Sequence, residues 1–304
     1  MKKKKRSRSH IRSRLVSRSI RKCFPLFMLP TLAAFCIGFL WPFVQGLYLS
    51  FCDFTIIKDA EFVGFTNYVK AFGDSGFRYS FMYTAAFAIV SIIAINVLAF
   101  TVAYFLTQNI KGSNIFRTVF FMPNLIGGIV LGYIWSMIFD GILMKYGTFL
   151  LAETKFGFWG LLILMCWQQV GYMMIIYIAG LQSVSEDMME AARIDGATKW
   201  QTLWRITIPN VMSSFTICIF LTLTNSFKLF DQNLALTGGA PVLFMEDGSM
   251  INSTEMMALN IYSTFYASGS NRGVAQAKAV LFFILVAVLA MAQLKFTREK
   301  EVEA

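Results

Sequence analysis

Six long stretches without a single Asp, Glu, Lys or Arg run through this 304-residue chain, and they constrain its fold more than any other feature. An ionised side chain at the middle of a bilayer costs about 2.5–3.5 kcal/mol, and roughly 20 apolar residues cross the hydrocarbon layer. The stretches cover residues 23–52, 79–110, 118–139, 156–185, 206–227 and 279–294. The pattern therefore predicts an all-α, polytopic membrane protein with six transmembrane helices.

The sixth stretch has only 16 residues. We expect residues 274–277 to lengthen it and the side chains of Lys278 and Lys295 to snorkel from its ends toward water. The first stretch follows a basic tail but lacks a small-residue cleavage site, so we interpret it as an uncleaved span kinked by its prolines. The segment 256–271 is too polar to cross, and we expect an interfacial or re-entrant amphipathic segment there.

The overall composition supports the membrane class. Hydrophobic residues make up 57% of the chain and charged residues 14%, whereas a soluble globular protein has about 25% charged residues. A chain of this length cannot bury so much apolar surface in one soluble core. The five cysteines are widely spaced and mostly belong to apolar runs, so we interpret them as small hydrophobic residues rather than as disulfide partners or metal ligands.

The basic residues are distributed unevenly along the chain. Eleven of the 27 Lys and Arg residues lie between residues 2 and 22, so the excess positive charge belongs to one tail and does not indicate nucleic-acid binding. Within the tail, Ile11, Leu15, Val16 and Ile20 recur at helical spacing, which suits a helix lying on anionic lipid. With six spans, 19 of the 27 basic residues fall on the side that holds both termini. The positive-inside rule therefore predicts cytoplasmic termini.

These boundaries predict four segments. Residues 1–23 form a basic cytoplasmic tail, and residues 24–78 form the first transmembrane helix and an external loop. Residues 79–296 hold spans two to six, with the connecting loop 182–210 on the cytoplasmic side, and residues 297–304 form a cytoplasmic C-terminus.

Most enzymatic sites are excluded by composition. The only histidine is His10 in the tail, so a Ser-His-Asp or Cys-His site is ruled out, and the sequence contains no phosphate-binding P-loop. The centres of the predicted spans hold no ionisable group, which disfavours a proton-coupled carrier. Movement of a solute through this chain would need energy from another subunit.

The loop 182–210 carries the most distinctive local pattern. Ser185 is a good N-cap for a helix whose first turn holds acidic residues, and Gly196 is a natural stop at its other end. A second helix fits residues 198–207, and Pro209 is expected to end it at Ile208. Ala192 and Gly196 give this first helix a small-residue side that could enter a partner's groove. The alternative is an ordinary amphipathic loop helix resting on the membrane.

The same loop resembles a known motif. The run from Glu190 to Ala197, followed by the sequence Ile-Thr-Ile-Pro at 206–209, resembles the EAA motif of permease subunits in binding-protein-dependent ABC importers. The segments 62–68, 226–231 and 237–241 are similar to those of carbohydrate-importer permeases, and their order resembles the first of two non-identical permeases. Ala240 stands where that family usually has a third glycine.

The resemblance implies a bacterial plasma-membrane protein with defined partners. These are a second homologous permease forming a heterodimer, a cytoplasmic ATPase dimer that binds ATP and Mg²⁺, an extracytoplasmic sugar-binding protein and membrane lipid. No cofactor is expected in this chain, and neither catalysis nor nucleic-acid binding is implied. The residues implied in coupling to the ATPase are Glu190, Ala191, Ala192, Arg193, Asp195 and Gly196.

A path for the cargo is suggested by polar side chains in spans four and five. The candidates are Gln168, Gln169, Asn225, Lys228 and Asp231. Amides suit a hydroxyl-rich ligand, and Trp167, Tyr172 or Phe227 could stack on sugar rings, but amides also join helices and Lys228 and Asp231 could simply pair on one helix. An oligosaccharide is the leading cargo. The alternatives are another polar solute such as glycerol phosphate, or a membrane scaffold without transport.

Overall fold

The computed structural model describes residues 28–298 except 109, 246, 247 and 268, and only the backbone of residues 270 and 298. The lipid-bound tail helix expected around Ile11 to Ile20 lies outside these residues. Five described helices are long and apolar enough to cross a membrane, and a bent pair makes a sixth. They are Met28–Leu49, Ser75–Leu106 (α4), Gly128–Tyr146, Thr154–Gln182 (α7), the pair Lys199–Asn210 with Met212–Phe227, and Arg272–Thr297.

Shorter elements connect these spans. Within the span Met28–Leu49, α2 is Trp41–Leu49; α6 is Gly128–Leu143, α11 is Met212–Phe227 and α14 is Arg272–Arg298. The connecting helices are α3 (Thr66–Gly73), α5 (Ser113–Phe121), α8 (Glu186–Ile194), α9 (Lys199–Thr202), α10 (Ile208–Asn210), α12 (Asp231–Leu236) and α13 (Met257–Ala267). With 11 residues, α13 is too short to span a bilayer.

The predicted helical class is confirmed in its main features, and two short antiparallel hairpins that the prediction did not include are also present. Cys52–Asp53 (β1) pairs with Glu61–Phe62 (β2), and Val242–Phe244 (β3) pairs with Met250–Asn252 (β4). Each strand has only two or three residues, so the hairpins reverse the direction of a connecting loop and do not form a sheet layer. The chain is mostly helical, with its strands confined to loops between spans.

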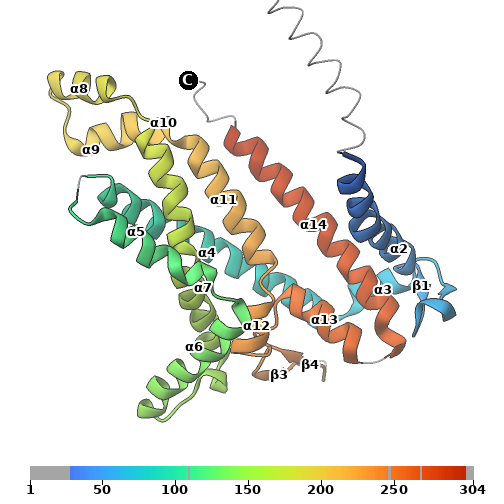
Figure 1. Cartoon of the computed structure of the whole chain (residues 1–304). Helices are drawn as coiled ribbons and strands as arrows, with labels where there is room; N and C mark the ends of the chain where they lie inside the picture. The colour runs from blue at the N-terminus through green and yellow to red at the C-terminus, as the bar shows by residue number, and fades with distance from the viewer. Residues whose placement is uncertain (1–27, 109, 246–247, 268, 299–304) are drawn as a thin grey trace, which may run out of the picture.

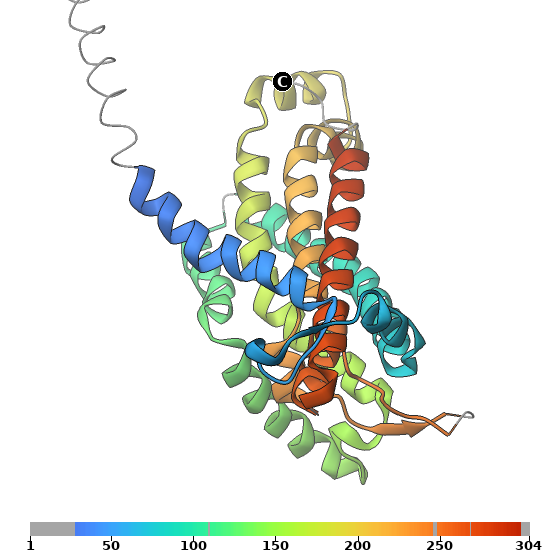
Figure 2. The same ribbon diagram turned by 90° about the vertical axis from the view of Figure 1, so that its right-hand side faces the viewer.

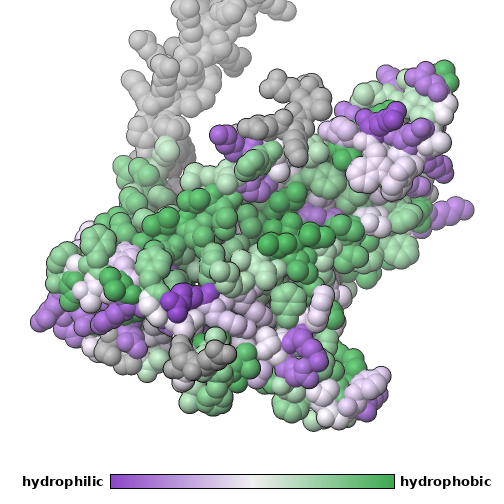
Figure 3. Space-filling model, turned by 180° about the vertical axis from the view of Figure 1, so that it is seen from behind, coloured by the Kyte–Doolittle hydropathy of each residue, from purple (hydrophilic) through white to green (hydrophobic). Residues whose placement is uncertain are grey.

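The spans run alternately up and down between two ends of the molecule (Figure 1). One end holds α8 and α9, together with the start of the first described helix and the finish of α14. The opposite end holds α6, α12 and the β3–β4 hairpin. In Figure 2 the first helix crosses in front of α14, and its N-terminal half stands away from the other helices. Figure 3 shows a broad hydrophobic band across the face opposite to the one seen in Figure 1, as expected of a surface in contact with lipid.

Helix α7 is the centre of the packing, since two thirds of its most apolar stretch is buried. Its Tyr177 is fully buried against the rings of Phe100 and Phe215, at centroid distances of 5.5 and 4.8 Å. The Tyr177 hydroxyl donates a 2.7 Å hydrogen bond to Oδ1 of Asn96 on α4, so a buried polar group is satisfied. Gly171 of α7 lies so close to α5 that a Cβ atom there would be 1.8 Å from the carbonyl oxygen of Phe120.

The third span differs from the sequence expectation of residues 118–139. Helix α5 ends at Phe121 and α6 begins at Gly128, because Pro123 has no N–H group for a continuing helix and Gly127 is extended, with ψ of 140°. Helix α6 then runs past Asp140, whose carboxylate accepts a 2.8 Å hydrogen bond from the Leu150 N–H. The span therefore lies later in the sequence than the charge-free stretch.

Two of the spans accommodate proline through a π-helical turn. Cys36–Leu40 forms such a turn before Pro42, and Leu203–Thr207 (η6) forms another before Pro209. The wider turn makes room where the proline ring would clash with a carbonyl and where its missing N–H breaks the ladder. The expectation that Pro209 ends its helix at Ile208 is wrong. The helix continues to Asn210 and then bends by 69° into α11.

Candidate functional site

The α8 loop, defined here as residues 183–210, begins much as the sequence indicates. Ser185 takes the extended N-cap conformation, with ψ of 133°, and Glu186 and Asp187 follow in the first turn. The Ser185 hydroxyl makes no capping hydrogen bond, so the residue marks the position without serving as a side-chain cap. The two carboxylates still lie where the helix dipole favours negative charge.

The other end of α8 is closed by the backbone. Gly196 has φ of +75°, and its N–H bonds the carbonyl of Arg193 at 3.1 Å, while the Ala197 N–H bonds the carbonyl of Ala192 at 2.9 Å. This pair of bonds is a Schellman motif, which satisfies two carbonyls that a helix end leaves free. A residue with a Cβ atom is strained at this φ, so the glycine is required by the turn itself.

A second cap starts the returning half of the loop. The Thr198 hydroxyl accepts a bond from the Gln201 N–H at 3.3 Å, and the Gln201 amide oxygen accepts one from the Thr198 N–H at 2.8 Å. This capping box fixes the start of α9 without help from other spans. Gly196 thus ends α8 and Thr198 begins α9, and local hydrogen bonds define these ends of the two helices.

The exposed side of α8 is only partly the one expected. Glu190, Ala191 and Arg193 are exposed, as are Asp195 and Gly196, but Ala192 is buried at 5% exposure. Of the small-residue side, Ala192 therefore faces its own chain, whereas Gly196 is open to the outside. The outer surface carries large apolar groups instead, since Met188, Ile194, Trp200 and Trp204 are 40%, 86%, 67% and 54% exposed. Of these, Trp200 and Trp204 pack together with ring centroids 5.6 Å apart.

The amide side chains of α7 form two separate pairs. Gln168 is buried, donates to the Ile126 carbonyl at 3.2 Å and accepts from Gln232 of α12 at 2.7 Å. Gln169 is half-buried and accepts a 2.8 Å hydrogen bond from Asn225 of α11. The Gln168 pair holds α7 to α12. The Gln169–Asn225 pair, which joins α7 to α11, is less enclosed.

Lys228 and Asp231 do not form the intrahelical pair that their spacing suggested. Helix α11 ends at Phe227, and Asp231 begins α12. Among the residues that the structure describes, the ion pairs are Lys155–Glu153 and Lys278–Asp74. Both Lys228 and Asp231 are exposed. Both lie at the turn between α11 and α12, where neither has an ion-pair partner among the described residues.

The aromatic residues proposed for stacking fall into different surroundings. Trp167 is 44% exposed and lies edge-on to Trp135 of α6, with ring centroids 5.6 Å apart. Phe227 is only 3% exposed, within a cluster that includes Phe77 and Met257. Of these residues, Trp167 has the accessible ring face, whereas Phe227 is part of the core.

The sequence reasoning missed a buried charge. Lys278 does not snorkel to water: its side chain is 0% exposed, and its ammonium donates to Asp74, Asn260 and Thr264 at 2.5, 3.0 and 2.7 Å. These acceptors come from the start of α4 and from α13, so one lysine joins three helices. Asn260 and Thr264 lie four residues apart, on one face of a helix. This spacing was the sequence signal that acceptors for the Lys278 ammonium could lie together on α13.

Asp74 also begins α4, and its carboxylate accepts hydrogen bonds from the N–H groups of Gly76 and Phe77 at 2.8 and 3.3 Å. Burial by itself raises the pKa of Asp74. The Lys278 ammonium and the two amide N–H groups outweigh burial, so the pKa of this carboxyl lies below its ordinary value. Asp74 therefore stays ionised and serves both as a helix cap and as the counter-ion of Lys278.

These features define a polytopic helical protein with an exposed, self-capped helical loop at one end and paired amides among its central spans. The model of the family described as "Binding-protein-dependent transport system inner membrane component" matches residues 95–298, which include the α8 loop. The chain belongs to this family.

Individual relatives cover nearly the whole chain. The "Probable starch degradation products transport system permease protein AmyD" of Thermoanaerobacterium thermosulfurigenes is 42% identical, over 91% of this chain and 94% of its own length. The "Multiple sugar-binding transport system permease protein MsmF" of Streptococcus mutans is 30% identical, over 91% and 95%. A crystal structure of a bacterial ABC transporter involved in the import of alginate aligns with a TM-score of 0.77 at 18% identity, over 93% and 98%, and so shares the fold.

Proposed function

We propose that this chain is the permease subunit of an ATP-driven importer that moves a carbohydrate, specifically an oligosaccharide, into the cytoplasm by alternating access. The observation that carries the proposal is the 42% identity, along nearly the full length of both chains, to a permease named for transport of starch degradation products. A second relative is also named for sugar transport. The family description names binding-protein dependence, so the cargo arrives from an extracytoplasmic binding protein.

The α8 loop is the proposed coupling contact with a cytoplasmic ATPase dimer, which binds the ATP and Mg²⁺. Support comes from its exposed charges at Glu190 and Asp195, and from the exposed apolar side chain of Ile194. The excess of basic residues on this side favours a cytoplasmic position for the loop and for both termini. The first described helix stands partly away from the bundle (Figure 2), which leaves room for a second permease subunit.

The cargo path is proposed to pass the Gln169–Asn225 pair. Sugar hydroxyls both donate and accept hydrogen bonds, and each of these amides offers both kinds of group. Lys228 and Asp231 lie at the adjoining turn without an ion-pair partner among the described residues, so they are available to an arriving ligand. Gln168 is hydrogen-bonded to Gln232 of α12, and we assign it a structural role in fixing α7 against α12 beside the path.

Uptake in cells tests the function directly. In a strain lacking the chain, wild-type protein expressed with its neighbouring transport genes should restore uptake of radiolabelled maltotriose and leave glycerol 3-phosphate uptake unchanged. Glu190→Lys should insert normally but abolish uptake, because it reverses a charge at the contact, while Lys155→Gln, far from the loop, should transport normally. Restored uptake of glycerol 3-phosphate alone would replace the sugar assignment, and full uptake by Glu190→Lys would remove the coupling role.

The path is tested by changing both amides together. Gln169→Leu with Asn225→Leu leaves no orphan partner and should preserve assembly, yet reduce maltotriose uptake at least tenfold, about 1.4 kcal/mol of transition-state stabilisation. The matched control is Ser213→Ala, an exposed change on the same α11 helix. Normal uptake by a stably assembled double variant would show that the pair only joins two helices.

A further inference from the structure

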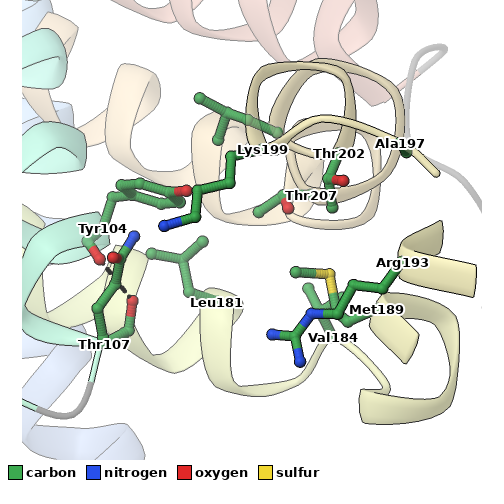
Figure 4. Close-up of a pocket in the computed structure, with 12 residues that line it drawn as sticks. Tyr104, Thr107, Leu181, Val184, Met189, Arg193, Ala197, Lys199, Thr202 and Thr207 are labelled. Carbon is green, nitrogen blue, oxygen red and sulfur yellow. Dashed lines mark hydrogen bonds between the residues drawn. The ribbon is translucent and has the colours of Figure 1, made fainter.

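A cavity of about 450 Å³ lies beneath the α8 loop, between α8, α9 and the ends of α4 and α7 (Figure 4). Arg193 from the last turn of α8 and Lys199 from the start of α9 both project toward it. The residues that line it include no Asp or Glu, and neither cation belongs to an ion pair within the described part of the chain. The cavity is therefore positively charged without an internal counter-ion.

The facing wall supplies polar groups from the last turn of α4. Tyr104 and Thr107 lie across the cavity from Arg193 (Figure 4), and the Thr107 hydroxyl donates to the Tyr104 carbonyl at 2.9 Å. Thr107 also lines a neighbouring cavity of about 290 Å³ that contains Arg117. The Nε atom of Arg117 is buried and has no hydrogen-bond partner among the described residues. Two cations without an ion-pair partner among the described residues indicate a site for an anion in the larger cavity, and the unsatisfied donor shows that the neighbouring cavity can also accept one.

An apolar cleft adjoins the charged cavity. It has a volume of about 420 Å³ and shares Tyr104, Gln108, Lys199 and Leu203 with the cavity. Phe100, Phe105 and Trp200 form its apolar part. Phe105 and Trp200 are 57% and 67% exposed, so the cleft opens on the outer surface of the helices. A single ligand that fills both spaces must carry a negative charge at one end and a hydrocarbon chain at the other.

We propose that this paired site binds one anionic phospholipid from the leaflet at the α8 end. Its phosphate lies between Lys199 and Arg193, and one acyl chain follows Phe105 and Trp200. Basic pockets between membrane helices suit anionic head groups, and tryptophan prefers the membrane interface. The lipid joins the end of α4 to the start of α9 and so steadies the α8 loop. The site does not depend on which cargo the chain carries.

Hydrogen–deuterium exchange of the purified full-length chain in nanodiscs tests the proposal. Nanodiscs of phosphatidylcholine alone are compared with ones containing increasing phosphatidylglycerol, up to about 30 mol %. Phosphatidylglycerol should slow exchange in residues 101–108 and 196–203. Lys199→Gln should need about tenfold more phosphatidylglycerol for the same protection, because it removes one charge-assisted contact. Arg205→Gln is the matched control, as Arg205 is an exposed cation of the same loop that lies outside the cavity lining.

Three outcomes would overturn the site. Phosphatidylglycerol could leave both segments unprotected. Alternatively, Lys199→Gln and Arg205→Gln could raise the phosphatidylglycerol content needed for protection by the same factor, which would indicate an effect of general surface charge. Inorganic phosphate added to phosphatidylcholine nanodiscs could give the full protection, which would assign the cavity to a soluble anion instead of a lipid. A second substitution, Phe105→Asp, should abolish protection by phosphatidylglycerol while leaving the oligomeric state and secondary structure of the purified chain unchanged; full protection of this variant would also overturn the site.

Discussion

Charged side chains have opposite surroundings in the helical body near the start of α4 and in the α8 loop. In the body, Lys278 is fully buried and its ammonium meets three acceptors from two other helices. In the loop, Glu190 and Arg193 are exposed, and the hydrogen bonds that shape α8 and α9 are local. The body is held by contacts between distant parts of the chain, whereas the loop keeps its shape alone and leaves its charges for another molecule.

The largest expected effect is on the buried charge. Lys278→Met leaves the buried Asn260 and the half-buried Thr264 without their donor and removes the counter-ion of Asp74, whose side chain is 37% exposed and so is partly screened by water. We expect a loss of about 2–4 kcal/mol, measured by thermal or denaturant unfolding in detergent. Lys155→Met removes the exposed pair with Glu153 and should cost less than about 1 kcal/mol. Adding Asp74→Asn to Lys278→Met should recover part of the loss. Equal stability of the two lysine variants would erase the contrast between body and surface.

A second change probes packing in the body. Gly171→Ala would place a methyl group 1.8 Å from the Phe120 carbonyl oxygen, so α5 and α7 must separate. We expect a loss of about 1–3 kcal/mol or more in unfolding free energy, as for other overpacked cores. Gly141→Ala, where no atom lies within 4 Å, should be neutral or slightly stabilising. A neutral Gly171→Ala would mean that the two helices do not touch there.

In the loop the corresponding change should act locally. Gly196→Ala strains a backbone with φ of +75° and should cost about 1–2 kcal/mol in the stability of the loop. Hydrogen exchange in residues 186–202 should rise while the spans keep their protection, since few of their contacts depend on this turn. A loss of protection across α7 and α11 would show that the loop and body unfold together.

The smallest expected effect is a pH dependence through Asp74. Because its folded pKa lies below the ordinary value of 3.8, ionised Asp74 stabilises the fold fully above that pH. The stabilisation is lost as pH falls through the folded pKa. The unfolding temperature of wild type should therefore drop more steeply below about pH 4 than that of Asp74→Asn. Glu153→Gln, at an exposed pair, should retain the wild-type slope.

How far the sequence predicts this fold depends on whether the deciding contacts are local. The spans at α4, α7 and α14 follow from the energetic cost of charge in a bilayer, and the stop at Gly196 follows from its backbone freedom. Lys278 could not be placed in this way, because its main partner, Asp74, is 204 residues away in the chain. The third span was misplaced because the charge-free rule gave too little weight to Pro123 and excluded Asp140.

The candidate sites also differ in whether local or distant contacts define them. The α8 loop is specified by neighbouring residues, so its helices and its glycine were predicted closely, and the error at Pro209 came from a π-helical turn that widens the helix before the proline. The amide pairs depend on how α7, α11 and α12 meet, so the sequence indicated Gln168 and Asn225 but not Gln232 as a partner. Spacing alone placed Lys228 and Asp231 on one helix, which the turn after Phe227 prevents.

The buried ammonium of Lys278 also bears on the order of assembly. An unpaired lysine in the last span would add about 2.5–3.5 kcal/mol to the cost of inserting it deep in the bilayer. Asp74 and Asn260 precede Lys278 in the chain, so both acceptors have been synthesised before the lysine emerges from the ribosome. The last helix to be made therefore carries the lysine to acceptors that already exist, so its ammonium need not remain unpaired in the bilayer once α4 and α13 lie beside it.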